Sequence, residues 1–186
     1  MINTELLLAA WLEKLQKKWD TEEYYYDVEE AKKVFKFVSK LTNDRGASRN
    51  FDLLEFQFEI ITEILCVKRR SDGKRKHREA HINIPRKNGK SFLAAIIVVY
   101  LFFCQRHIFG ALFILTANTT TQAGELYGTV EHFIKANKTL RRYCKITSST
   151  KTIIRKDNGN KLMVLSSDAD NADSFNDYVA VLDEIH

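Results

Sequence analysis

The sequence predicts an α/β fold in which helices flank a sheet of parallel strands. A short apolar run, Ala80 to Ile84, leads through Gly89-Lys90-Ser91 into a long apolar run, Phe92 to Cys104. A second continuous apolar run, Gly110 to Ala117, precedes a segment with helical spacing, Thr119 to Asn137. Continuous apolar runs of strand length are typical of parallel strands covered on both faces. The alternation of strand and helix therefore places the chain in the α/β class.

The first part of the chain is predicted to be helical. Apolar residues recur at helical spacing in Leu6 to Lys18 and in Asp52 to Val67. Between them a helix is expected over Asp27 to Leu41, because Asp27 is a good N-cap and Glu30 follows three residues later. Thr42 to Asn50 is rich in turn residues and is expected to connect this region to the rest.

The stretch Ile84 to Ser91, I-P-R-K-N-G-K-S, lies where the predicted strand turns into a helix. Free N–H groups and the positive end of the dipole make a helix N-terminus an anion site. Lys90 would then reach terminal phosphates, and the Ser91 hydroxyl would bind Mg²⁺. The phosphate-loop pattern is only partly met, because Ile84 replaces its first glycine and Pro85 lacks an N–H. On these residues alone, a lysine at an ordinary surface turn is an equal alternative.

The end of the chain supports the phosphate-loop interpretation. Tyr178 to Leu182 is a buried-strand pattern that runs directly into Asp183 and Glu184. Carboxylates at the tip of such a strand are placed to complete a nucleotide site. Asp183 would hold the Mg²⁺ shell, and Glu184 would orient and deprotonate the attacking water. Upstream, Thr152 to Arg155 and Leu162 to Leu165 flank the turn D-N-G-N and predict a β-hairpin.

Composition is that of a folded globular protein. The chain has 186 residues, 45% of them hydrophobic, with seven glycines and one proline. Its three cysteines, Cys66, Cys104 and Cys144, have no metal-binding spacing and are expected to be reduced. No signal peptide or membrane span is expected, so we predict a soluble, cytoplasmic protein. The net charge of +5 mildly favours a polyanionic partner.

Three features allow two interpretations each. Lys68 to Arg78 is the most basic stretch and suits either a solvated hairpin tip, which is favoured, or contact with DNA phosphates. Tyr24 to Tyr26 suits packing better than base stacking. Gln57 is either a surface glutamine or an adenine reader that uses one donor and one acceptor of its amide.

Several segments in order resemble the ATPase half of a phage terminase large subunit. The resemblance runs from about Tyr26 to His186. Its pieces are Y-D-V-E-E-A, L-E-F-Q, A-H-I-N-I-P-R-K-N-G-K-S, L-T-A-N-T-T-T-Q-A, L-S-S-D-A and V-L-D-E-I-H. It implies a P-loop NTPase of the RecA-like (ASCE) class, with residues 1–50 as an N-terminal helical region and residues 51–186 as the ATPase domain.

The resemblance also implies roles for single residues. In this family the Walker A loop often lacks the first glycine and carries an arginine where Arg86 falls, so Arg86 would contact the γ-phosphate. Gln57 matches the glutamine that contacts the adenine in this family. The implied nucleotide-binding set is Gln57, Arg86, Lys87, Asn88, Gly89, Lys90 and Ser91, with Ser91 and Asp183 on the metal. Glu184, Arg86 and Lys90 would act in catalysis, with ATP and Mg²⁺ as ligands. Ser174 departs from the glycine that relatives tend to have before the last strand.

The resemblance further implies an ATP-driven motor that packages viral double-stranded DNA. Its expected partners are DNA, a small terminase subunit and the capsid portal, in a ring homo-oligomer at the procapsid in the host cytoplasm. Relatives continue beyond the acidic pair into a coupling motif and a nuclease domain. We therefore expect a fragment that cannot cut DNA and that by itself binds nucleotide weakly and hydrolyses it poorly.

Two other functions remain open at this point. A helicase-type translocase is suggested by Asp183-Glu184-Ile185-His186, which also fits a D-E-x-H box. A non-catalytic nucleic-acid or assembly module is suggested by the charge of Lys68 to Arg78. Equilibrium binding of ATP with Mg²⁺ separates the enzymes from the module, since a binding module has no reason to retain nucleotide.

Overall fold

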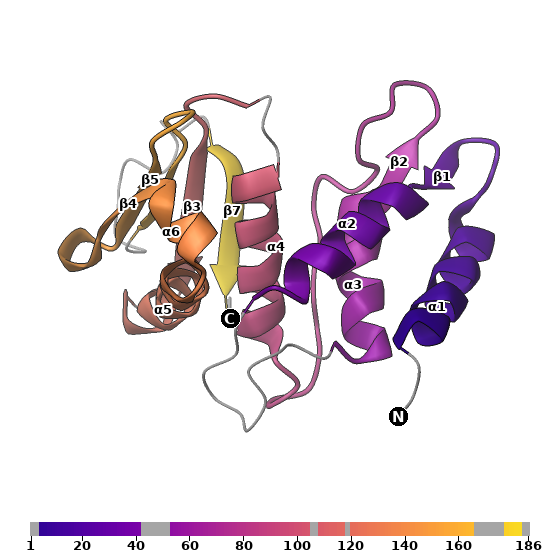
Figure 1. Cartoon of the computed structure of the whole chain (residues 1–186), viewed down its shortest axis with the longest axis horizontal. Helices are drawn as coiled ribbons and strands as arrows, with labels where there is room; N and C mark the ends of the chain where they lie inside the picture. Colours follow the sequence, from indigo (N-terminus) through magenta and orange to yellow (C-terminus); the bar gives the residue numbers. More distant parts are fainter. Residues whose placement is uncertain (1–3, 42–52, 105–107, 118–119, 166–176, 184–186) are drawn as a thin grey trace. The chain divides into compact units, whose positions relative to one another are not determined.

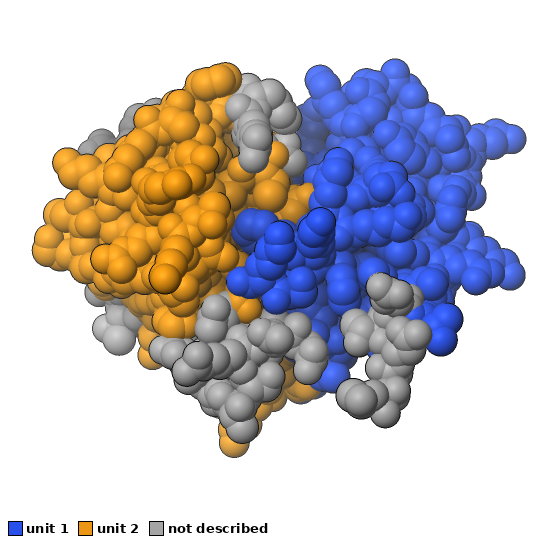
Figure 2. Space-filling model, in the orientation of Figure 1, with its two compact units in different colours: residues 1–40, 48–85 blue, residues 41–47, 86–186 orange. Residues whose placement is uncertain are grey.

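The computed structural model describes residues 4–41, 53–104, 108–117, 120–165 and 177–183. The chain divides into two compact units (Figure 2). Unit 1 comprises residues 1–40 and 48–85, and unit 2 comprises residues 41–47 and 86–186. Residues 53–85 thus group with the N-terminal helices. The predicted division into an N-terminal region, residues 1–50, and an ATPase domain, residues 51–186, stays a prediction.

The described residues of unit 1 form three helices and a two-stranded ribbon (Figure 1). Its elements are α1 (Thr4–Trp19), β1 (Tyr24–Tyr26), α2 (Val28–Val38), α3 (Glu55–Cys66) and β2 (Val67–Arg69). The three predicted helices are confirmed with slightly different ends. Their apolar faces bury a common core that includes Trp11, Leu15, Val34, Phe58, Ile61 and Leu65. Amphipathic helices of this kind are stabilised mainly by such packing rather than by helix propensity.

The start of α2 confirms the predicted cap. The side chain of Asp27 accepts a hydrogen bond from the N–H of Glu30 at 2.9 Å. Lys68 Nζ also donates to Asp27, over 2.5 Å, which ties β2 to this helix end. Burial opposes ionisation of Asp27, but the two hydrogen bonds outweigh it and hold its pKa below the ordinary value.

The three consecutive tyrosines form a strand rather than a stacking platform. β1 pairs antiparallel with β2, with Tyr26 opposite Val67. Tyr26 is buried, as the packing interpretation expects, and Tyr24 and Tyr25 are half-buried. A strand this short was not predicted, because three residues carry too little alternation to be recognised.

In unit 2, the residues that the structure describes form a five-stranded sheet and helices that pack on it. Its elements are α4 (Lys90–Cys104), β3 (Leu112–Ala117), α5 (Thr120–Ala136), α6 (Lys138–Arg142), β4 (Cys144–Thr147), β5 (Thr152–Arg155), β6 (Lys161–Val164) and β7 (Asp177–Asp183). The strand order is β4-β5-β6-β3-β7. β3 is parallel to both β6 and β7, whereas β4, β5 and β6 pair antiparallel.

The α/β prediction is confirmed, with a mixed rather than an all-parallel sheet. The predicted hairpin is β5–β6, and its D-N-G-N turn reverses the chain, so that β5 runs against β6. Gly159 in this turn has φ of 72°, a conformation that favours glycine. β4 was not predicted, since Cys144–Thr147 has only two apolar residues.

The strand predicted over Ala80 to Ile84 was wrong. Residues 78–85 have no regular secondary structure, and side-chain exposure alternates only weakly, with Ile82 and Ile84 half-buried. A strand is defined by its hydrogen-bonded neighbour. Among the described residues, this segment pairs with no strand of either sheet. An apolar pattern alone could not reveal that.

Helix α4 is the core element of unit 2. It is apolar on all sides and buried along most of its length, which is typical of a central helix. It packs against α5, with the rings of Phe92 and Phe133 5.3 Å apart, and Phe102 meets Phe113 of β3 at 5.1 Å. Within the described part of the chain, no helix is long and apolar enough to span a membrane.

A buried arginine anchors the far end of α4. Arg155 is 4% exposed and donates through Nη1 to the carbonyl oxygens of Phe102, at 2.6 Å, and Phe103, at 3.3 Å. Its other nitrogens pair with Asp157. The last carbonyls of a helix lack partners within it, so Arg155 satisfies two of them and joins the β5–β6 hairpin to α4.

Replacing Arg155 with methionine should destabilise the chain by about 3 kcal/mol, because two buried carbonyl groups lose a charged donor. Chemical denaturation monitored by circular dichroism measures this change. Arg142→Met, at an exposed position of α6, is the control and should change stability by less than about 0.5 kcal/mol. Equal stability of Arg155→Met and the unmodified chain would show that the buried hydrogen bonds contribute nothing.

Candidate functional site

The turn before α4 presents two functional side chains at a helix N-terminus. Gly89 has φ of 81°, which glycine adopts readily, and Lys90 and Ser91 are the first two residues of α4. The helical hydrogen bonds begin at once, with Leu93 N–H donating to the Gly89 carbonyl at 2.9 Å. The first N–H groups of a helix have no partner within it, so this end can bind an anion.

Asp183 faces this helix start from the last position of β7. It lies opposite Ala117 at the end of β3, so it marks the carboxyl edge of two parallel strands. Ser91 Oγ donates to Asp183 Oδ2 over 2.8 Å, and Lys90 Nζ lies 3.7 Å from Asp183 Oδ1. Residues from the two predicted halves of a nucleotide site, 92 positions apart, are therefore in contact.

The carboxylate of Asp183 is largely buried. Asp183 is only 9% exposed, and a buried charge is costly without partners. Ser91 and Lys90 are those partners. The Lys90 side chain keeps 35% of its surface exposed, and 3.7 Å is a long ion pair. The ammonium of Lys90 is therefore accessible to an anion that arrives from solvent.

The pair Ser91 and Asp183 has the donor chemistry that Mg²⁺ requires. Both offer hard oxygen atoms, and Mg²⁺ at phosphate-transfer sites takes one or two protein oxygens plus phosphates and water. In the part of the chain that the structure describes, no group of three or more His, Cys, Asp or Glu side chains could hold a metal ion. The two oxygens can thus supply part of a Mg²⁺ shell, and a bound phosphate would supply more.

The loop between Pro85 and α4 is exposed and partly strained. Arg86 and Lys87 form a turn, and Asn88 Nδ2 donates to the Arg86 carbonyl over 3.4 Å. Lys87 has φ of 68°, which is uncommon for a residue with a Cβ. Strained residues of this kind gather at ligand-binding loops. This conformation could not be predicted from the sequence, because glycine or asparagine normally marks it.

Two predicted site residues cannot be placed with the others. Gln57 belongs to α3 in unit 1, where its Oε1 accepts a hydrogen bond from Leu54 N–H at 3.1 Å. This contact makes Gln57 part of the helix cap, and its adenine role stays a prediction. Glu184 and the loop containing Ser174 lie outside the described residues. Sequence reasoning also missed Arg155, although its place two residues after inward-facing Ile153 was a usable signal.

Comparison with known families gives a match over most of the chain. The model of the terminase large subunit, ATPase domain, matches residues 55–186. This range contains Lys90, Ser91 and Asp183 as well as Gln57 and Glu184. The chain belongs to the terminase large subunit ATPase domain family.

Solved structures add a likeness in fold. The crystal structure of the HK97 bacteriophage large terminase matches with a TM-score of 0.65 and 18% sequence identity. The match covers 82% of this chain and 30% of that terminase, so the chain spans less than a third of its structural relative. A search of curated proteins found no match. The predicted terminase resemblance is confirmed, and the mixed α/β unit has the fold of a terminase ATPase region.

Proposed function

We propose that the site at the start of α4 binds ATP with Mg²⁺ and that the chain hydrolyses ATP as a P-loop NTPase of the RecA-like class. The observation that carries this proposal is the contact of Ser91 and Lys90 with Asp183. A helix-start lysine and hydroxyl beside a strand-end carboxylate are what phosphate and Mg²⁺ binding require. Membership in a family of ATPase domains supports the same assignment.

Each side chain has a separate task in this proposal. Lys90 leaves Asp183 and places its ammonium on the β- and γ-phosphates. Ser91 and Asp183 would hold Mg²⁺, which neutralises charge that develops on the phosphates. Glu184 orients the attacking water and accepts its proton, and Arg86 contacts the γ-phosphate. Catalysis then consists mainly of positioning and charge stabilisation.

We further propose that the protein is the motor subunit that packages viral double-stranded DNA. We infer this role from membership in the family and from the similarity in fold to the large terminase of a bacteriophage. The small terminase subunit, the capsid portal and further copies of the motor in a ring are the partners that this role requires. The host cytoplasm, at the procapsid, is then the place of action.

Arg86→Ala should lower kcat for ATP hydrolysis by a factor of hundreds or more, on the scale of other arginine contacts to a γ-phosphate. Such a contact becomes stronger as charge develops on the γ-phosphate in the transition state, so its loss should change KM little. Steady-state ATPase assays in a full-length context measure both constants. Arg141→Ala, a matched loss of one exposed arginine in unit 2, should leave them unchanged. A rise in KM with unchanged kcat would argue against the proposed contact.

A further inference from the structure

A ribbon in unit 1 carries the most basic stretch of the sequence, Lys68 to Arg78. β2 is followed by a tight turn in which Gly73 N–H donates to the Arg69 carbonyl at 2.9 Å and Gly73 has φ of 66°. The chain then runs back beside β2, with Lys76 N–H donating to the Val67 carbonyl at 2.8 Å. We call β1, β2 and residues 70–78 the basic ribbon. Its backbone is well fixed by these bonds, so its side chains project from a defined frame.

Some cations of the basic ribbon already have carboxylate partners. Lys68 pairs with Asp27 over 2.5 Å, and Arg69 pairs with Asp72 over 2.7 Å. Four others have no carboxylate partner among the described residues: Arg70, Lys74, Lys76 and Arg78. Arg70, Lys74 and Arg78 are also exposed. The ribbon therefore presents a cluster of positive charge that the described chain does not neutralise.

Aromatic rings hold two of these cations in place. Lys76 Nζ lies 4.1 Å from the ring centre of Trp19 and 4.4 Å from that of Tyr24. Arg70 lies 5.5 Å from the ring of Tyr25 and donates to a backbone carbonyl, that of Thr21, at 2.9 Å. Cations fixed in this way lose less conformational freedom on binding an anion.

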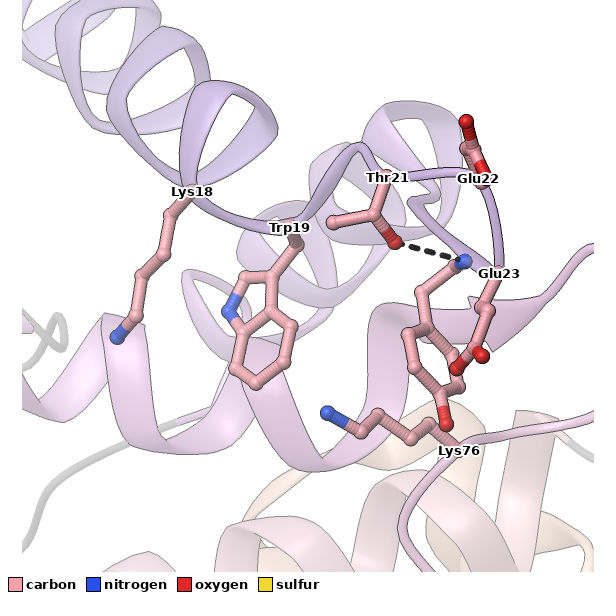
Figure 3. A pocket seen from close by; sticks show the side chains of 7 residues that line it. Lys18, Trp19, Thr21, Glu22, Glu23 and Lys76 are labelled. Atoms are coloured by element: carbon pink, nitrogen blue, oxygen red, sulfur yellow. Dashed lines mark hydrogen bonds between the residues drawn. The ribbon is translucent and has the colours of Figure 1, made fainter.

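The same contacts argue against stacking of bases on the ribbon. The rings of Trp19 and Tyr24 border a hollow of about 500 Å³ that also includes Glu22 and Glu23 (Figure 3). Lys76 covers one face of each ring, so a base could stack on that face only by displacing the ammonium. The two carboxylates disfavour an anion inside the hollow. Phosphates are therefore expected on the exposed cations of the turn.

We propose that the basic ribbon binds the phosphate backbone of double-stranded DNA without reading its sequence. The inference rests on the proposed role as a DNA motor and adds a surface to it. Fixed cations without carboxylate partners suit phosphates, and blocked rings disfavour single-stranded binding. Such contacts hold a duplex weakly and allow it to move, as a translocating protein requires.

The test is duplex binding by the triple variant Arg70→Gln, Lys74→Gln, Arg78→Gln. Fluorescence anisotropy with a 30-base-pair duplex of arbitrary sequence gives the binding constant between about 50 and 200 mM salt. Each lost phosphate contact removes about 0.9 from the slope of log K against log salt, so the slope should fall by about 2.7. At 50 mM salt the affinity should fall roughly a thousandfold or more by the same relation.

A matched control changes three lysines that already have carboxylate partners. Lys14→Gln, Lys32→Gln and Lys33→Gln together remove the same charge from unit 1. This variant should keep the slope of the unmodified chain. Equal losses in both triple variants, or duplex binding unchanged in the ribbon variant, would overturn the proposal. Tighter binding to a single-stranded oligonucleotide than to the duplex would overturn it as well.

ATP binding separates this inference from the proposed function. The ribbon variant should bind ATP with Mg²⁺ as the unmodified chain does, because its substitutions lie outside the site on α4 and β7. If the unmodified chain fails to bind ATP, the proposed function is wrong whatever the ribbon does. If ATP binding is normal and the ribbon variant still binds the duplex normally, only the ribbon inference is wrong.

Discussion

Lys90→Ala is expected to reduce ATP hydrolysis below detection and to weaken ATP binding by at least about tenfold, or roughly 1.4 kcal/mol. The ammonium of Lys90 is the main positive charge that the start of α4 offers to the β- and γ-phosphates. The substitution should leave the fold intact, since the Lys90 side chain is 35% exposed and its ion pair with Asp183 is long, at 3.7 Å. Steady-state hydrolysis in a full-length context and equilibrium binding measure the two effects.

A matched control for Lys90 is Lys138→Ala, which removes one exposed lysine from α6 of the same unit. It should hydrolyse and bind ATP as the unmodified chain does. Both variants should have the same free energy of unfolding within about 0.5 kcal/mol. Normal hydrolysis by Lys90→Ala would show that the site is misassigned.

Asp183→Asn and Glu184→Gln are expected to have different effects on ATP binding and on kcat, because the two carboxylates have different proposed roles. Asp183→Asn removes a metal-side charge next to Ser91, so ATP binding should lose its dependence on Mg²⁺ and turnover should stop. Glu184→Gln preserves shape and removes only the base, so kcat should fall by about a thousandfold while ATP stays bound. Binding with and without Mg²⁺, followed by analysis of the retained nucleotide, distinguishes the two.

Equal loss of ATP binding in Asp183→Asn and Glu184→Gln would show that the acidic pair is structural. Thermal unfolding of both variants is the accompanying control. Asp183→Asn keeps an oxygen that can accept the Ser91 hydrogen bond, so it should remain folded.

Local patterns predicted the helices and most of the sheet because their determinants lie close together in the sequence. Asp27 and Glu30 define the start of α2, and D-N-G-N defines the β5–β6 turn. Ala80 to Ile84 failed because strand formation depends on a neighbour far away in the chain. Arg155 was missed for the same reason, since its buried carbonyl partners lie more than 50 residues upstream.

The candidate site was predicted in part. Glycine, lysine and serine before an apolar helix, and a carboxylate after an apolar strand, have chemistry that is visible in the sequence. Their contact confirms that Lys90, Ser91 and Asp183 lie together. The positive φ of Lys87 could not be predicted, because it is set by the turn that α4 and the preceding chain impose. The roles of Lys90, Ser91 and Asp183 in nucleotide binding stay predictions, as do those of Gln57, Arg86 and Glu184.

The most direct test of the central claim is equilibrium binding of ATP to the chain by isothermal titration calorimetry, with and without Mg²⁺. The account predicts saturable binding at one site per chain that is strengthened by Mg²⁺, because Ser91 and Asp183 present two oxygens to the metal beside the phosphate-binding helix start. Absence of binding at millimolar ATP, or binding that Mg²⁺ does not affect, would contradict it.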